Sequence, residues 1–161
     1  MKNRSIMDAI DWLEEKFLVY TFFATIALIS AQIFMRAALN SSLVWSEELA
    51  RYLFIWQCWV GVSFAERKTG QIKIEFLREV LSPEKKRWLD IVAITITMGT
   101  AILLIIFGLD LCSNFMRSGI KSASLRIPMY LIYASMPVGC LLHTIRNARK
   151  LIGLFQLREV S

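Results

Sequence analysis

The sequence has few of the residues from which disulfide, metal and redox sites are built. Its 161 residues include three cysteines, Cys58, Cys112 and Cys140, and one histidine. The cysteines show no C-x-x-C spacing, and a disulfide framework or a zinc site needs more sulfur and imidazole groups than these. A glycine-rich phosphate-binding loop is missing as well. We therefore expect no catalytic residues, no metal site and no cofactor, and we do not expect an enzyme.

Charge is missing from three long stretches of the chain, although 20% of all residues are charged. Residues 17–35, 91–109 and 127–145 each run for 19 residues without Asp, Glu, Lys or Arg. As helices, these stretches would each be about 28 Å long, close to the thickness of a bilayer core. Because backbone groups in lipid must be hydrogen-bonded within their own segment, uncharged runs of this length predict transmembrane helices.

A fourth span is expected over residues 46–65, although its first turn is charged. Residues 52–65 carry no charge, and extending the run back to residue 46 adds Glu47, Glu48 and Arg51. We expect this polar turn to lie at the membrane interface. A re-entrant or surface segment is the alternative, and it would place the two termini on opposite sides. The sequence thus predicts an all-α membrane protein with a single four-helix domain over residues 1–161.

The distribution of basic residues predicts the orientation of these spans. Of the 19 Lys and Arg residues, 14 lie in segments 1–16, 66–90 and 146–161, and five lie elsewhere. Cytoplasmic loops carry an excess of Lys and Arg, so both termini and segment 66–90 are expected in the cytoplasm. The net charge of +6 then reflects orientation and contact with anionic phospholipid, and we expect no binding of nucleic acid.

Two further segments predict amphipathic helices that lie on the membrane surface. Before the first span, apolar residues recur at helical spacing and acidic residues fall mainly between them; the apolar positions are Ile6, Ile10, Leu13 and Phe17. Residues 72–81 show a similar pattern between the second and third spans. Trp12, Trp45 and Trp88 lie near span ends, where indole rings commonly anchor a helix at the interface.

The polar segment that opens the second span, residues 44–52, is the most informative part of the chain. Ser46 is a candidate N-cap, because its hydroxyl could accept a hydrogen bond from the first turn. Glu47 and Glu48 would then lie at the positive end of the helix dipole. Arg51 is within reach of both carboxylates on the helix surface. Simple capping is one interpretation, and a polar contact with a partner protein is the other.

Aromatic and small residues continue this pattern along the second span. Tyr52, Trp56 and Trp59 form a stripe on one side of the helix. Gly61 and Ala65 are spaced so that another helix could approach closely, and Ser135 and Gly139 repeat that spacing in the fourth span. Such pairs pack within one bundle by default, and faces that the bundle leaves unused are candidates for contact with a second membrane protein.

These residues carry a resemblance to a known family. The stretch Trp45-Ser46-Glu47-Glu48-x-Ala50-Arg51-Tyr52-x-Phe54-x-Trp56 is followed by Gly61, Ala65 and Arg67 and then by Ile72-x-Ile74-Glu75-x-Leu77. This pattern resembles the small membrane subunit of the tripartite ATP-independent periplasmic (TRAP) transporters, the DctQ type. The similarity covers the four-span layout and the total length, and its specific part runs from residue 45 to residue 81.

The resemblance implies a partner and a role for the chain. Such a subunit pairs with a large permease that carries the substrate and sodium sites and works by an elevator-type motion. A periplasmic binding protein delivers an organic acid, such as a C4-dicarboxylate or sialic acid, at the inner membrane of a bacterium. The small subunit would enlarge the static scaffold. Its candidate contact residues are Trp45, Ser46, Glu47, Glu48, Arg51, Tyr52, Trp56, Trp59 and Gly61.

Two other functions remain to be set against this interpretation. An autonomous four-helix exporter would need a membrane-embedded acid in an early span, and residues 17–35 contain none. A disulfide-generating redox enzyme would need paired cysteines on the outer side of the membrane, and only Cys112 is expected near that side.

Overall fold

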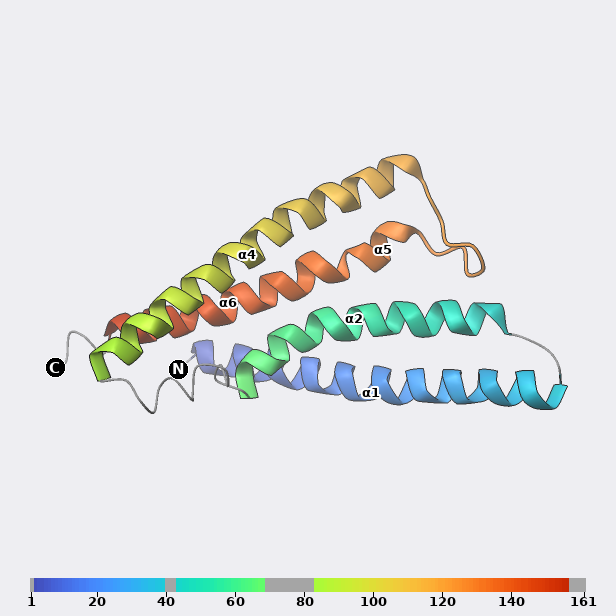
Figure 1. The fold of residues 1–161 in the computed structure, drawn as a ribbon, viewed down its shortest axis with the longest axis horizontal. Coiled ribbons are helices and arrows are strands. Elements are labelled where there is room, and N and C mark those ends of the chain that lie inside the picture. The colour runs from blue at the N-terminus through green and yellow to red at the C-terminus, as the bar shows by residue number, and fades with distance from the viewer. Residues whose placement is uncertain (1, 40–42, 69–82, 157–161) are drawn as a thin grey trace.

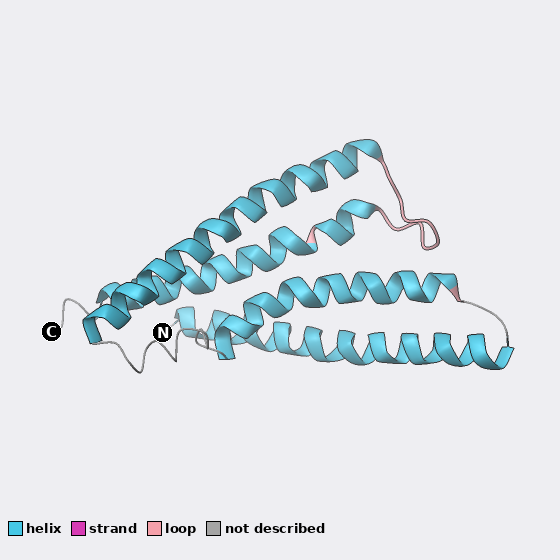
Figure 2. Ribbon diagram, in the orientation of Figure 1, coloured by secondary structure: helices cyan, strands magenta, loops and turns pink. Residues whose placement is uncertain are grey.

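The computed structural model describes residues 2–39, 43–68 and 83–156, and almost all of these residues are helical (Figures 1 and 2). The helices are α1 (Lys2–Leu39), α2 (Val44–Lys68), α4 (Pro83–Ser118), α5 (Met129–Tyr133) and α6 (Ser135–Gln156). A loop of residues 119–128 joins α4 to α5. The described part of the chain therefore has the all-α architecture that the sequence predicts.

The four long helices lie side by side in the order α1, α2, α6, α4 (Figure 1). α2 packs against α1 and α6, and α6 packs against α2 and α4, so α1 and α4 form the two edges. We call the end where α1 begins and α6 ends the terminal end, and the opposite end, which holds loop 119–128, the loop end. This arrangement keeps one side of each edge helix uncovered along its length.

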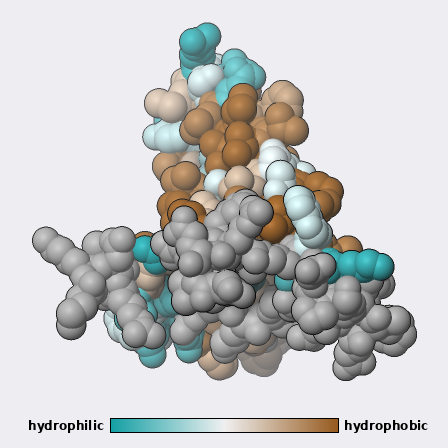
Figure 3. Space-filling view, turned by 90° about the vertical axis from the view of Figure 1, so that its left-hand side faces the viewer, coloured by the Kyte–Doolittle hydropathy of each residue, from teal (hydrophilic) through white to brown (hydrophobic). Residues whose placement is uncertain are grey.

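The two edge helices have the composition of membrane spans. Met7–Leu39 of α1 and Trp88–Ser118 of α4 are long and apolar enough to cross a membrane, whereas the described parts of α2 and α6 contain no stretch that meets the same test. In the most apolar 18-residue stretch of each helix, only 6% of α1 and 17% of α4 is buried inside the bundle. Hydrophobic side chains accordingly reach the surface in Figure 3. Outward-facing apolar residues on both edges are the inverse of a water-soluble bundle.

The helices α2 and α6 approach each other closely, and a glycine makes this contact possible. A Cβ atom added at Gly139 would lie 2.4 Å from the backbone oxygen of Trp59. The sequence prediction that Gly139 allows close helix approach is therefore confirmed. A Cβ atom at Gly108 would similarly lie 2.8 Å from the Cε of Met136, so α4 also packs tightly on α6.

The helix expected over residues 127–145 starts later and is interrupted. It begins at Met129, and Ala134 separates α5 from α6 (Figure 2). Pro137 is the physical cause, because its ring has no N–H to donate to the carbonyl of Tyr133 and crowds that carbonyl. The chain therefore changes direction at the loop end, where α5 contacts α4.

The sequence prediction of a separate surface helix before the first span is wrong. α1 is one continuous helix from Lys2 to Leu39. The part of its acidic face formed by Asp11 and Glu14 turns toward the bundle, since the side chain of Glu14 is buried while Leu13 is 59% exposed; Asp8 and Glu15 stay exposed. A buried arginine on α6, described below, attracts this acidic face. The second predicted surface helix, residues 72–81, lies outside the described residues.

The α2–α6 contact gives a first test of the fold. Gly139→Ala should lower the free energy of unfolding by about 1–3 kcal/mol, because the new methyl group overlaps the backbone at Trp59. Gly99→Ala is the matched control, since a Cβ atom there meets nothing within 4 Å. The free energies would be compared in detergent micelles. Equal stability of the two variants would contradict the close packing described here.

Candidate functional site

The polar segment predicted from the sequence forms the first two turns of α2, at the loop end. Ser46 is not the N-cap, because α2 begins at Val44. Its hydroxyl instead donates to the backbone oxygen of Leu43 at 2.8 Å, and the residue is 1% exposed. Ser46 thus fixes the start of the helix from inside the bundle. The two glutamates that follow point in different directions, and they have different partners.

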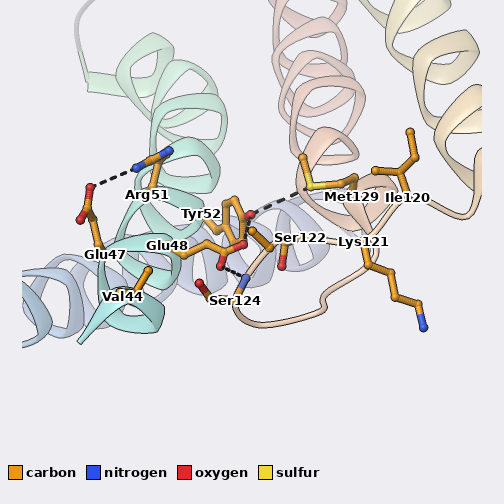
Figure 4. A pocket seen from close by; sticks show the side chains of 11 residues that line it. Val44, Glu47, Glu48, Arg51, Tyr52, Ile120, Lys121, Ser122, Ser124 and Met129 are labelled. Atoms are coloured by element: carbon orange, nitrogen blue, oxygen red, sulfur yellow. Dashed lines mark hydrogen bonds and ion pairs between the residues drawn. The ribbon is translucent and has the colours of Figure 1, made fainter. Parts of the chain in front are cut away.

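Glu48 holds loop 119–128 against α2 (Figure 4). Its Oε2 atom accepts hydrogen bonds from the backbone N–H groups of Ser124, at 2.8 Å, and Leu125, at 3.2 Å. Its Oε1 atom accepts a bond of 2.5 Å from the hydroxyl of Tyr52. Three donors converge on one carboxylate, and hydrogen bonds to a charged acceptor are among the stronger ones in proteins. Glu48 therefore links residues that are 76 positions apart in the chain.

Loop 119–128 is a compact structure of its own. Its ends approach each other in a single bridge between Lys121 and Pro128. Inside the loop, the backbone N–H of Ile127 donates to the hydroxyl of Ser122 at 3.1 Å. Gly119 and Arg126 adopt positive φ angles of 62° and 55°, which reverse the chain direction. For Arg126 this conformation costs energy that a glycine would not lose, so the hydrogen bonds around the loop must compensate.

An open cleft of about 370 Å³ lies between α2 and this loop. Figure 4 shows its wall of polar side chains from α2 on one side and the loop on the other. The lining residues are Val44, Glu47, Glu48, Arg51, Tyr52, Ile120, Lys121, Ser122, Ala123, Ser124 and Met129. Charges of both signs face this cleft, which is typical of a polar protein contact. It holds the hydrogen-bonded edge of a loop rather than a set of catalytic groups.

Glu47 and Arg51 face outward from the same two turns. Their side chains are 59% and 65% exposed and form an ion pair of 3.2 Å, as the sequence predicts. An exposed pair of this spacing contributes only about 0.3–0.5 kcal/mol to stability. Glu47 also accepts a long hydrogen bond of 3.4 Å from Gln32 of α1. The pair is therefore available to a partner at little cost to the fold.

Two tryptophans of α2 pack inside the bundle, whereas a glycine of the same helix does not. Trp56 packs edge-on against Phe17 of α1, with 6.4 Å between ring centroids. The backbone of Trp59 meets α6 at the glycine described above. Gly61, in contrast, faces open space, since a Cβ atom there would meet nothing within 4 Å. Gly139 of the small-residue pair on α6 is thus used inside the bundle, whereas Gly61 of the pair on α2 is not in contact at its Cα hydrogen side.

The three predicted interface anchors are exposed at the ends of the bundle. Trp12 is 60% exposed and Trp88 is 70% exposed, and both lie toward the terminal end. Trp45 is 45% exposed at the loop end. These positions suit indole rings at a membrane surface, and their role as anchors stays a prediction.

A buried cluster at the terminal end was not recognised from the sequence. Arg146 of α6 is 7% exposed and forms ion pairs with Glu14 at 2.5 Å and with Asp11 at 2.6 Å. Its Nε atom also donates to the hydroxyl of Ser63 at 2.9 Å. Ser63 is fully buried and donates to Glu14 at 3.1 Å. We call Asp11, Glu14, Ser63 and Arg146 the terminal cluster, and it joins α1, α2 and α6.

A neighbouring ion pair extends this connection. Lys150 of α6 donates to the carboxylate of Glu66 at 2.6 Å and to its backbone oxygen at 2.8 Å. The sequence did contain a signal for the cluster. Asp11 and Glu14 precede the first span and Arg146 follows the last, and charges beside lipid are usually paired. Spacing along the chain could not identify the pairs, because 132 positions separate Glu14 from Arg146.

The loop contact gives a second prediction. Glu48→Ala should leave the amide groups of Ser124 and Leu125 without their acceptor, so hydrogen exchange in loop 119–128 should be about tenfold faster. Glu47→Ala is the control, because its carboxylate binds Arg51 and Gln32 and not this loop. Hydrogen–deuterium exchange followed by mass spectrometry would measure both. Unchanged exchange in the Glu48 variant would show that the loop holds its conformation independently of α2.

The terminal cluster gives a third prediction. Arg146→Gln should cost about 3–5 kcal/mol, because it leaves two buried carboxylates without their counter-charge. Adding Glu14→Gln should restore part of that loss. Arg149→Gln, at an exposed position, should change stability by less than about 0.5 kcal/mol. Unfolding in detergent would test the series, and an additive double variant would argue against a coupled cluster.

Comparisons with known proteins agree with this architecture. Residues 25–157 match the family described as tripartite ATP-independent periplasmic transporters, DctQ component. The sialic acid TRAP transporter small permease protein SiaQ of Vibrio cholerae is 29% identical over 158 residues, which cover 98% of this chain and 90% of the relative. The C4-dicarboxylate TRAP transporter small permease protein DctQ of Pseudomonas aeruginosa is 27% identical over 126 residues, covering 76% of this chain and 60% of that protein.

A third relative differs in length. The sialic acid TRAP transporter permease protein SiaT of Haemophilus influenzae is 41% identical over 81 residues, which make up 50% of this chain and 13% of the relative. There, the region similar to this chain is one part of a much longer permease, which implies that the small and large components work together. The matched family covers most of the described helices. The chain therefore belongs to the DctQ family and is a small permease subunit of a TRAP transporter, a multi-pass membrane protein.

Proposed function

We propose that this chain is the accessory scaffold subunit of a sodium-coupled TRAP transporter. It pairs with a large elevator-type permease subunit and enlarges the static part against which the mobile part moves. The large subunit carries the substrate and sodium sites, and a periplasmic binding protein delivers the substrate. Family membership supports the transporter class, and the finer role rests on the surface of the chain.

The observation that carries this proposal is the uncovered apolar surface of α1 and α4. Each edge helix is long and apolar enough to cross a membrane, and each is covered by the bundle on one side only. Charged residues with buried side chains are paired inside the terminal cluster instead of lining a passage. A brace needs this arrangement, because its outer surface must meet both lipid and a larger protein.

The substrate class follows from the relatives. Their names specify sialic acid for SiaQ and SiaT and C4-dicarboxylates for DctQ. Both are organic acids. We propose an organic acid of this kind as the substrate of the complete transporter, with its binding residues supplied by the other components.

We further propose that the chain spans the bacterial inner membrane four times with both termini in the cytoplasm. The excess of Lys and Arg in segments 1–16, 66–90 and 146–161 supports this orientation. The terminal cluster would then lie at the cytoplasmic side and loop 119–128 at the periplasmic side. In that orientation, the cleft beside Glu48 faces the periplasm, where the binding protein is found. The binding protein is therefore a candidate to contact this cleft.

The exposed ion pair of α2 gives a test of partner assembly. The double variant Glu47→Ala/Arg51→Ala should insert normally and weaken assembly with the large permease and substrate uptake, because the pair contributes little to the fold. Recovery of the large subunit on the tagged small subunit and uptake of labelled sialic acid or succinate by cells would measure this. Arg117→Ala, an exposed charge at the same end, is the control. Wild-type assembly and uptake in the double variant would restrict the pair to a role within α2.

A further inference from the structure

The middle of α2 carries a polar side chain, Gln57, whose amide oxygen accepts no hydrogen bond from the described residues. Gln57 lies near the centre of the span expected over residues 46–65. Its Nε2 atom donates to the hydroxyl of Thr25 on α1 at 2.9 Å, and Thr25 in turn donates to the backbone oxygen of Thr21 at 2.8 Å. Among the described residues, none donates a hydrogen bond to the Oε1 atom of Gln57. A carbonyl oxygen left in this state at membrane depth is unfavourable.

This amide opens into a groove on the surface of the bundle. The groove has a volume of about 270 Å³ and is lined by Gln57 and by four apolar residues of α1; these are Leu18, Val19, Phe22 and Phe23. The two phenylalanines are 55% and 65% exposed and lie with 6.0 Å between ring centroids. Lipid chains could cover these rings but could not donate a hydrogen bond to the amide. An occupant that satisfies the whole groove must carry a polar hydrogen.

A second observation indicates that a helix can reach this place. Glu47, Phe54 and Gly61 are seven residues apart, nearly two helical turns, so they share one face of α2. We call these three residues the open face of α2. Phe54 is 59% exposed, and a Cβ atom at Gly61 would meet nothing within 4 Å. Gly61 is one turn from Gln57, and a glycine lets a neighbouring backbone come close.

The opposite edge of the molecule lacks this combination among its described residues. Exposed threonines of α4 donate their hydroxyl hydrogens to their own helix: Thr95 to Ile91 at 2.7 Å and Thr100 to Ile96 at 3.0 Å. Such threonines are compatible with lipid, because their donors are used locally. The two edges are thus chemically different: Gln57 has a carbonyl oxygen without a donor among the described residues, whereas these threonines of α4 need no partner.

We propose that the open face of α2 and the Gln57 groove bind a membrane-embedded helix of the large permease subunit, with a polar side chain of that helix donating to Gln57. The α4 edge then faces lipid. This inference rests on the proposed function. The SiaT relative supports the choice of occupant, since the region similar to this chain is part of a longer permease there. A second copy of this chain would not explain why the two components occur in one polypeptide.

The main test compares two glycines that face open space. The small subunit is co-expressed with the large permease subunit of the same transporter and purified through a tag on the small subunit. Gly61→Leu should reduce recovery of the large subunit by about tenfold, because the side chain occupies the space that the partner helix needs. Gly99→Leu, on α4, should leave recovery at the wild-type level. The two positions are matched, since nothing lies within 4 Å of an added Cβ atom at either of them.

The amide is tested separately. Gln57→Leu should reduce recovery about threefold through loss of one interhelical hydrogen bond, and Thr100→Val on α4 should have no effect. A photoreactive residue at position 22 should crosslink to the large subunit, and one at position 107 should not.

Each other outcome overturns a distinct statement. If wild-type small subunit recovers no large subunit, the proposed function fails. If the wild type pairs and Gly61→Leu pairs equally well, the assigned face is wrong while the function stands. A crosslink from position 22 to a second copy of this chain, or only to lipid, would also overturn the assigned face.

Discussion

The architecture depends on one contact, the packing of α2 against α6, which joins the two halves of the bundle. It is secured at three levels. At the terminal end, Arg146 brings buried carboxylates and Ser63 together. In the middle, Gly139 lets α6 approach the backbone at Trp59. At the loop end, Glu48 on α2 holds the loop that precedes α5. Polar contacts at the two ends and close helix packing in the middle thus hold α2 and α6 together. We call this α2–α6 contact the seam.

This seam explains why so much of the surface is open. Because α2 and α6 occupy the centre, α1 and α4 are edges with one long helix packed along each, and many of their large apolar side chains are exposed. The chain therefore resembles a slab more than a closed bundle. A closed bundle would protect a passage between its helices, whereas a slab offers broad faces to its surroundings. That difference suits the scaffold role that we propose for this subunit.

The sequence predicts much of the fold and part of the site. Features that depend on neighbouring residues can be predicted, and contacts between distant residues cannot. Uncharged runs predict α1 and α4 because hydrophobic length is a local property. The Glu47–Arg51 pair is also local, at four residues' spacing, and was predicted. Glu48 binds a loop that is 76 positions away in the sequence, and Arg146 pairs with Glu14 of α1, which is 132 positions away. No local pattern could identify those partners. The amphipathic start of α1 predicts a separate surface helix, which is wrong, because a polar face has the same periodicity whether it meets water or a buried arginine.

The central claim is that this chain braces a transporter and does not move substrate itself. Transport by purified components in proteoliposomes tests it most directly, with labelled sialic acid and succinate, an imposed sodium gradient and the binding protein present. Vesicles with the small subunit alone should show no uptake, and vesicles with both membrane subunits should accumulate one of the two acids. Sodium-driven uptake by the small subunit alone would contradict the account.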